Sequence, residues 1–133
     1  MRMIIKEKIE FVEKDRQILA VEAIERLKNM LYDEEIEKIE KQLWKTLLLF
    51  EDYPFQTAKG LEFFYKIKGN EIFFSRKEKS VTRASVNIAL KKAIELQRDG
   101  IVIKGPKMLK SFGASYIYPV FMEIGVITKG AVE

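Results

Sequence analysis

The stretch L-E-F-F-Y-K-I-K-G-N-E-I-F-F-S, residues 61–75, decides the fold class of this chain. Apolar and polar residues alternate on both sides of Gly69-Asn70, a two-residue connection of the kind that closes tight β-hairpins. With the turn at these residues, facing positions sum to 139, so that Tyr65 lies opposite Phe74. The face that we expect to be buried carries Leu61, Phe63, Tyr65, Ile67, Ile72 and Phe74.

The other face of this hairpin mixes aromatic rings with charge. It carries Glu62, Phe64, Lys66, Lys68, Glu71, Phe73, Ser75 and Lys77. The register predicts ion pairs between Lys68 and Glu71 and between Glu62 and Lys77. Interleaved rings and cations can bind single-stranded nucleic acid by stacking and charge pairing. We nevertheless expect Phe64 and Phe73 to pack beneath the N-terminal helices, because large exposed aromatic surface is costly in a monomer.

Two amphipathic helices are predicted before the hairpin. Apolar residues recur at steps of three and four in residues 15–31, at Ile18, Leu19, Ala23, Ile24, Leu27, Met30 and Leu31. Asp33, followed by two glutamates, is typical of an N-cap, and the second helix carries Ile36, Ile39, Leu43, Leu47 and Phe50 on one stripe. Tyr53-Pro54 ends it. Residues 15–50 thus form an αα-hairpin or one long bent helix, and residues 3–13 either extend the first helix or form a strand.

Helical and extended segments alternate after the hairpin. Thr82 can cap a helix that ends near Gln97, with its apolar stripe at Val86, Ala89, Leu90, Ala93, Ile94 and Leu96. A short strand over Ile101–Ile103, a helical turn opened by Pro106, a helix over Tyr116–Ile124 and a final strand over Val126–Thr128 follow. The chain is therefore α+β: an N-terminal helical hairpin, a central β-hairpin, then helix, short strand, C-terminal helix and final strand. We expect a helical hairpin at residues 1–51 and a basic α+β domain at residues 52–133, packed as one compact unit.

Residues 105–128 resemble the end of a helix-turn-helix unit. A short helix from Pro106 to Phe112, a small-residue turn at Gly113-Ala114-Ser115, a second helix and a wing-like strand follow in that order. The second helix departs from the resemblance, because it is apolar almost all round and contains Pro119. A helix that contacts base edges needs polar side chains, so this one is expected to be a core element.

The composition excludes several function classes. The chain has 133 residues, with no Cys and no His, which rules out disulfides, thiolate ligands, and the commonest metal ligand and general base. Residues 104–107 lack the glycine spacing of a phosphate-binding loop. We expect no catalysis, no cofactor and no metal. The longest apolar runs are too short for a membrane span, and charge follows Met1 too soon for a signal peptide, so a cytoplasmic protein without membrane contact is expected.

Positive charge is concentrated in one part of the chain. Residues 75–110 hold 10 Lys or Arg and only 3 Asp or Glu, whereas residues 1–51 hold 10 and 12. Clustered cations are the electrostatic signature of polyanion binding, although a solvated lysine-rich face would have the same composition. We therefore predict a nucleic-acid-binding accessory or regulatory protein that acts through residues 66–110, with DNA favoured over RNA.

Three groups of side chains are the candidates for this contact, and the first is the hairpin face of rings and lysines described above. The row Arg83, Asn87 and Lys91, at steps of four, is expected to project from the third helix. Free amides and hydroxyls at the start of that helix favour a phosphate there. The full set of predicted contacts is Lys66, Lys68, Arg76, Lys77, Lys79, Ser80, Thr82, Arg83, Asn87 and Lys91. The alternative is a protein-interaction or structural module that oligomerises, as a homodimer, through its N-terminal helices.

Overall fold

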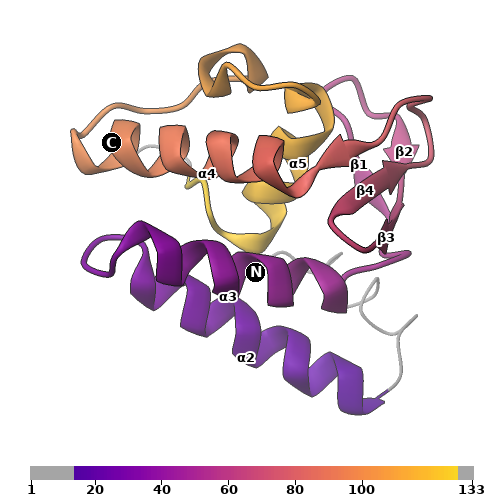
Figure 1. The fold of residues 1–133 in the computed structure, drawn as a ribbon, viewed down its shortest axis with the longest axis horizontal. Coiled ribbons are helices and arrows are strands. Elements are labelled where there is room, and N and C mark those ends of the chain that lie inside the picture. Colours follow the sequence, from indigo (N-terminus) through magenta and orange to yellow (C-terminus); the bar gives the residue numbers. More distant parts are fainter. Residues whose placement is uncertain (1–13, 129–133) are drawn as a thin grey trace.

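Helices precede and follow two small antiparallel sheets in the described chain, and the strands lie together at the right of Figure 1. The structure is a computed structural model that describes residues 14–128. Its elements are α2 (Lys14–Met30), α3 (Ile36–Leu49), β1 (Phe55–Gln56), β2 (Glu62–Phe63), β3 (Tyr65–Lys68), β4 (Glu71–Phe74), β5 (Val81–Thr82), α4 (Arg83–Arg98), the 3-10 helix η1 (Pro106–Leu109) and α5 (Ala114–Ile124). The predicted α+β class is confirmed. The alternatives for residues 3–13 lie outside the described residues.

The N-terminal helices form the expected αα-hairpin, in the lower half of Figure 1. The stripe of α3 is buried as predicted, with Ile39, Leu43 and Leu47 in the core and Ile36 packed against it. Two details were wrong. Ile18 and Leu19 are exposed on α2, where Ala20 turns inward instead. The N-cap of α3 is Glu35, not Asp33, and it makes no side-chain capping bond.

The central β-hairpin has the predicted register. Tyr65 faces Phe74 and Ile67 faces Ile72 across the Gly69-Asn70 turn, in which Gly69 has φ +58°. The sequence did not predict a third strand, but β5 pairs with β4 and places Val81 opposite Ile72. Thr82 then ends β5 and begins α4, so the sheet leads directly into the helix.

The predicted first hairpin strand is interrupted after Phe63. Residues Glu62–Phe63 pair with Phe55–Gln56 rather than with β4, and the rings of Phe55 and Phe63 stack at 5.7 Å. Leu61, expected in the core, is exposed. The alternating pattern of residues 61–68 predicted one continuous strand, but packing against the aromatic segment that follows α3 pairs its first part with β1 instead of β4.

The C-terminal half packs α4, η1 and α5 together. Thr82 Oγ1 accepts a bond of 3.1 Å from the amide of Ser85, the predicted cap, and Pro106 opens η1 as expected. That turn stops at Leu109, so the predicted helix to Phe112 was too long. Helix α5 buries Ile117, Val120, Phe121 and Ile124. It is a core element, as its departure from the helix-turn-helix resemblance predicted.

Neither C-terminal strand predicted from the sequence is present. Residues 101–103 form no ladder, with Ile101 and Val102 exposed. Residues 126–128 bond instead to a side chain: Gln97 Nε2 donates to Val126 O at 2.8 Å, and Gln97 Oε1 accepts from Thr128 N at 3.0 Å. The Gln97 amide thus satisfies backbone groups that a neighbouring strand would otherwise satisfy.

One cluster of buried side chains includes residues from both ends of the described chain, from Ala20 to Ile127. It includes a group of contacting rings, Phe50, Tyr53, Phe55, Phe63, Tyr65 and Phe74, against which the partly buried Tyr116 packs. The hydroxyl of Tyr65 donates to the carbonyl of Leu47 at 2.6 Å. Burial, and secondarily the nearby Glu51 carboxylate, raise the pKa of Tyr65 well above its ordinary value.

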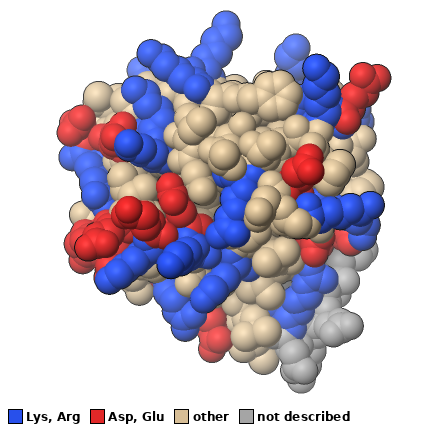
Figure 2. Space-filling model, in the orientation of Figure 1, with Lys and Arg blue, Asp and Glu red and all other residues tan. Residues whose placement is uncertain are grey.

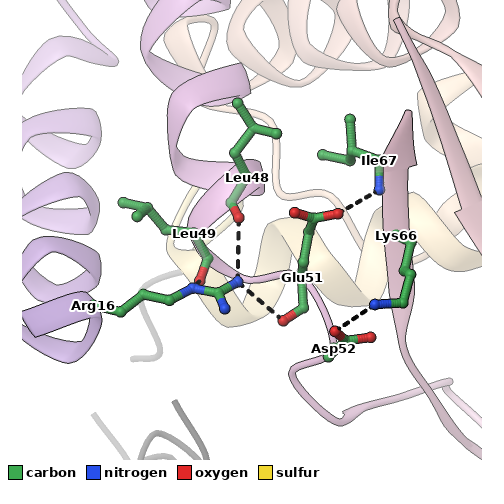
Figure 3. A network of polar contacts seen from close by, with 7 residues as sticks. All are labelled: Arg16, Leu48, Leu49, Glu51, Asp52, Lys66 and Ile67. Atoms are coloured by element: carbon green, nitrogen blue, oxygen red, sulfur yellow. Dashed lines mark hydrogen bonds and ion pairs between the residues drawn. The ribbon is translucent and has the colours of Figure 1, made fainter. Parts of the chain in front are cut away.

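A polar network ties the helical hairpin to the β-hairpin (Figure 3). The Arg16 guanidinium of α2 donates to the carbonyls of Leu49 (3.1 Å), Glu51 (3.3 Å) and Leu48 (3.4 Å) at the end of α3. The Glu51 carboxylate accepts a bond of 2.7 Å from the amide of Ile67 in β3. Carbonyls at a helix end need such partners, so Arg16 caps α3 while Glu51 holds the hairpin beside it.

Candidate nucleic-acid interface

The outer face of the β-hairpin presents two exposed rings beside lysines. Phe64 and Phe73 expose 46% and 41% of their surface, so the expectation that they pack beneath the N-terminal helices was wrong. Lys66 lies opposite Phe73 in the ladder. Lys68 Nζ is 5.8 Å from the centre of the Phe73 ring. The predicted ion pair of Lys68 with Glu71 is absent, because the Glu71 carboxylate accepts a bond from the Ser80 hydroxyl.

Lys66 has a carboxylate partner. Its ammonium is 2.9 Å from the Asp52 carboxylate, and both side chains are exposed (Figure 3). The hydrogen bond to Asp52 and the charge of the same group raise the pKa of Lys66. Its positive charge is therefore partly neutralised within the protein. Lys68 forms no ion pair with a described carboxylate, so it is the more available cation of this face.

The link between β4 and β5 carries the next predicted contacts. Arg76 Nε donates to the carbonyl of Glu62 at 2.8 Å, and Lys79 is exposed. Lys77 does not form the predicted pair with Glu62; its ammonium lies 3.9 Å from the centre of the Phe112 ring. The hairpin register does not extend to Glu62 and Lys77, because β2 pairs with β1.

The start of α4 is a capped helix end and not a free phosphate site. Val81 and Thr82 belong to β5 and pair with β4. The amide of Arg83 donates to Asn70 O at 2.7 Å, and Thr82 Oγ1 accepts from the amide of Ser85. The amides of Arg83 and Ser85 therefore have partners in the hairpin turn and the cap.

The row Arg83, Asn87 and Lys91 does not project as expected. At 3.6 residues per turn, Asn87 lies about 60° around the helix from the buried Leu90 and only about 20° from the buried Ile94, at the edge of the buried stripe. The Arg83 guanidinium packs 4.9 Å from the centre of the Trp44 ring on α3. Asn87 Oδ1 is buried and has no hydrogen-bond partner among the described residues. Lys91 alone of the three is exposed, so the row does not form a surface that could enter a groove.

A hollow of about 510 Å³ adds residues that sequence reasoning missed. Among the residues that line it are Lys77, Lys107, Lys110, Ser111, Phe112 and Ser115. One sequence signal could have found part of it. Pro106 predicts the turn that carries Lys107, whereas Lys110 follows that turn with a left-handed backbone (φ +50°), which no local signal predicts.

A second hollow, of about 490 Å³, lies between α2, the turn after β1 and α5. Its lining includes Ile24, Tyr118, Met122 and Glu123, with Lys28 as the one cation. This mixed lining is less suited to an anion than the lysine-lined hollow.

Basic side chains do not form one continuous patch on the face drawn in Figure 2. They are dispersed there between apolar and polar surface, and acidic side chains gather at the left, over the turn between α2 and α3. Within residues 14–128, no cluster of acidic side chains could hold a metal ion, and none of the helices has the length and apolarity needed to cross a bilayer. Comparison of the chain with protein-family models, curated proteins and solved structures found no match.

Proposed function

We propose that the protein is a nucleic-acid-binding accessory or regulatory protein of the cytoplasm, acting through residues 66–110 and the hairpin beside them. The observation that carries this proposal is the exposure of Phe64 and Phe73 next to Lys66 and Lys68 on one sheet face. Stacking on an aromatic ring contributes about 1–3 kcal/mol per base and tolerates any sequence.

The spacing of the two rings supports stacking of neighbouring bases. Phe73 lies opposite Lys66, and the amide of Ser75 donates to Phe64 O at 2.9 Å, which makes Phe64 and Phe73 diagonal neighbours. Such neighbours are about 7–8 Å apart on a sheet. An extended strand can therefore cross the hairpin with bases on both rings and its phosphates near Lys68 and Arg76.

This arrangement favours single strands over duplexes. The row on α4 that could have contacted base edges is engaged with Trp44 and the core. Binding is therefore expected to depend on stacking and charge more than on base identity. We take DNA as the favoured ligand over RNA.

Fluorescence anisotropy with labelled single-stranded DNA, single-stranded RNA and duplex DNA at two salt concentrations tests the proposal. Phe64→Ala and Phe73→Ala should each weaken single-strand binding by about 5- to 150-fold, the range that corresponds to one stacked base. The matched control is Tyr32→Ala, which removes a ring that is 58% exposed on the turn after α2. Absence of binding at low salt, or equal binding by all three variants, would contradict the proposal.

A homodimer formed through the N-terminal helices is the second candidate. Ile18, Leu19 and Val21 are exposed within about one turn of α2, an apolar surface of the kind that marks a protein contact. Light scattering at high micromolar concentration should then give twice the monomer mass, and Ile18→Glu should restore the monomer. Association through this face should barely respond to salt, whereas nucleic-acid affinity should fall steeply.

A further inference from the structure

The lysine-lined hollow has three lysines and no acidic residue in its lining. Lys77, Lys107 and Lys110 reach it from the β4–β5 link, from η1 and from the residue after η1, and no Asp or Glu lines it. None of the described carboxylates forms an ion pair with these three lysines, whereas Lys66 is paired with Asp52 and Lys38 with Glu34. Three ammonium groups around one hollow repel one another, and an anion seated between them would relieve that repulsion.

Neutral groups of the hollow also suit an oxyanion. Ser111 is one of the lining residues, and its buried Oγ has no hydrogen-bond partner among the described residues. Helix α5 begins at the same wall, with no acidic residue in its first turn, and the positive end of its dipole adds to the potential of the lysines. A hydroxyl donor and three cations together match a phosphate with several charged oxygens.

We propose that this hollow binds a phosphate monoester, of the kind carried at the end of a nucleic-acid strand. A monoester carries about −1.5 to −2 charges at pH 7, against one for a phosphodiester within a strand, so three unpaired lysines select the monoester. Phe112, 50% exposed and in contact with Lys77 on one ring face, gives the hollow an apolar wall for the terminal sugar or base.

The position of the hollow connects it with the hairpin face. Lys77 follows Phe73 by four residues, so their Cα atoms are at most about 14 Å apart. The link stays close to α5, because the Tyr116 hydroxyl donates to Arg76 O at 3.2 Å. A strand stacked on Phe64 and Phe73 can reach the hollow with its last few nucleotides. The inference rests on the proposed function, since it names the part of the strand that the hollow would hold.

The test compares fluorescently labelled oligothymidylates with a 5′-phosphate, with a 3′-phosphate or with no terminal phosphate. The label is at the end opposite the phosphate, and each phosphorylated strand is compared with an unphosphorylated strand that carries its label at the same end. One phosphorylated form should bind about tenfold or more tightly than the unphosphorylated one, the gain expected of a charged hydrogen bond. Lys107→Gln and Lys110→Gln should remove that gain. Lys104→Gln should keep it, because this exposed lysine of the same segment does not line the hollow.

The outcomes separate the two proposals. Equal binding of all three oligonucleotides would overturn the phosphate site while leaving nucleic-acid binding intact, and binding of none of them would contradict both. A gain that Lys104→Gln abolishes as fully as Lys107→Gln would assign the effect to general charge and overturn the site. Thymidine 5′-monophosphate is the last probe. If it competes as strongly as the phosphorylated strand, the ligand is a free nucleotide, and the proposal that the hollow binds the end of a strand is overturned.

Discussion

Replacement of Tyr65 by Phe should lower stability at neutral pH. The change removes the 2.6 Å bond from the Tyr65 hydroxyl to Leu47 O and leaves the ring in place. A hydrogen bond of this kind contributes about 0.5–1.5 kcal/mol. The Leu47 carbonyl keeps a second donor, the amide of Phe50 at 3.1 Å, so it is not left unsatisfied. We therefore expect a loss of about 1 kcal/mol in the free energy of unfolding.

Alkaline pH should reduce this difference. Burial raises the pKa of Tyr65 in the folded protein, whereas an unfolded tyrosine has a pKa of about 10. Above pH 10 the unfolded chain loses the proton and the folded chain keeps it, so the stabilisation from Tyr65 is complete below pH 10 and falls by about 1.4 kcal/mol per pH unit above it. The Phe variant lacks this dependence, and the two stabilities should meet near pH 11.

Urea unfolding followed by circular dichroism at pH 8, 10, 10.5 and 11 measures both effects. All other groups are common to both proteins, so their contributions to the pH dependence cancel in the difference. Tyr32→Phe, at an exposed position, should match wild type throughout. A difference between wild type and Tyr65→Phe that stays constant from pH 8 to pH 11 would refute the reasoning, because it would mean that the Tyr65 hydroxyl ionises as easily in the folded protein as in the unfolded one.

Three further perturbations test other parts of the structure. Thr82→Ala should cost about 1 kcal/mol in urea unfolding by removing the cap on Ser85 N, and Thr82→Ser should recover most of it. Gly113→Ala should cost about 2 kcal/mol or more in the free energy of unfolding, because Gly113 has φ +81° and an added Cβ would lie 2.5 Å from Val81 Cγ2. Wild-type stability of this variant would contradict the close approach of Gly113 to Val81. Asn87→Ala should leave any base preference unchanged in a selection from random DNA, whereas Lys91→Ala should weaken all sequences alike and reduce the salt slope by about one.

The elements that the sequence predicted well are those whose signals are local. The Gly69-Asn70 turn and the alternation beside it specify the register of β3 and β4, and the Thr82 cap specifies where α4 begins. The stripes of α3 and α4 were recognised because packing against the core follows the helical period. These signals sufficed for the α+β class.

The features that the sequence missed depend on partners distant in the chain. Strand β1 pairs with β2 because rings from residues 50–65 gather in one cluster, and residues 126–128 bond to the side chain of Gln97 instead of a strand. The candidate row on α4 failed for a different reason. Its members were expected to project from the helix, although the helical angle places Asn87 near the edge of the apolar stripe. The hairpin face was located correctly from the sequence, but the exposure of Phe64 and Phe73 depends on where the helices pack.

The single tryptophan gives the molecule an optical reporter of hairpin movement. Trp44 is only 6% exposed and lies under the Arg83 guanidinium, and the Arg83 backbone is bonded in turn to the hairpin turn at Asn70. Indole emission shifts to longer wavelength when the ring becomes hydrated, so displacement of the hairpin should redden it. A ligand that settles on Phe64 and Phe73 without moving the hairpin should leave the Trp44 spectrum unchanged. Emission spectra recorded during a titration therefore distinguish a rigid recognition surface from one that opens as it binds.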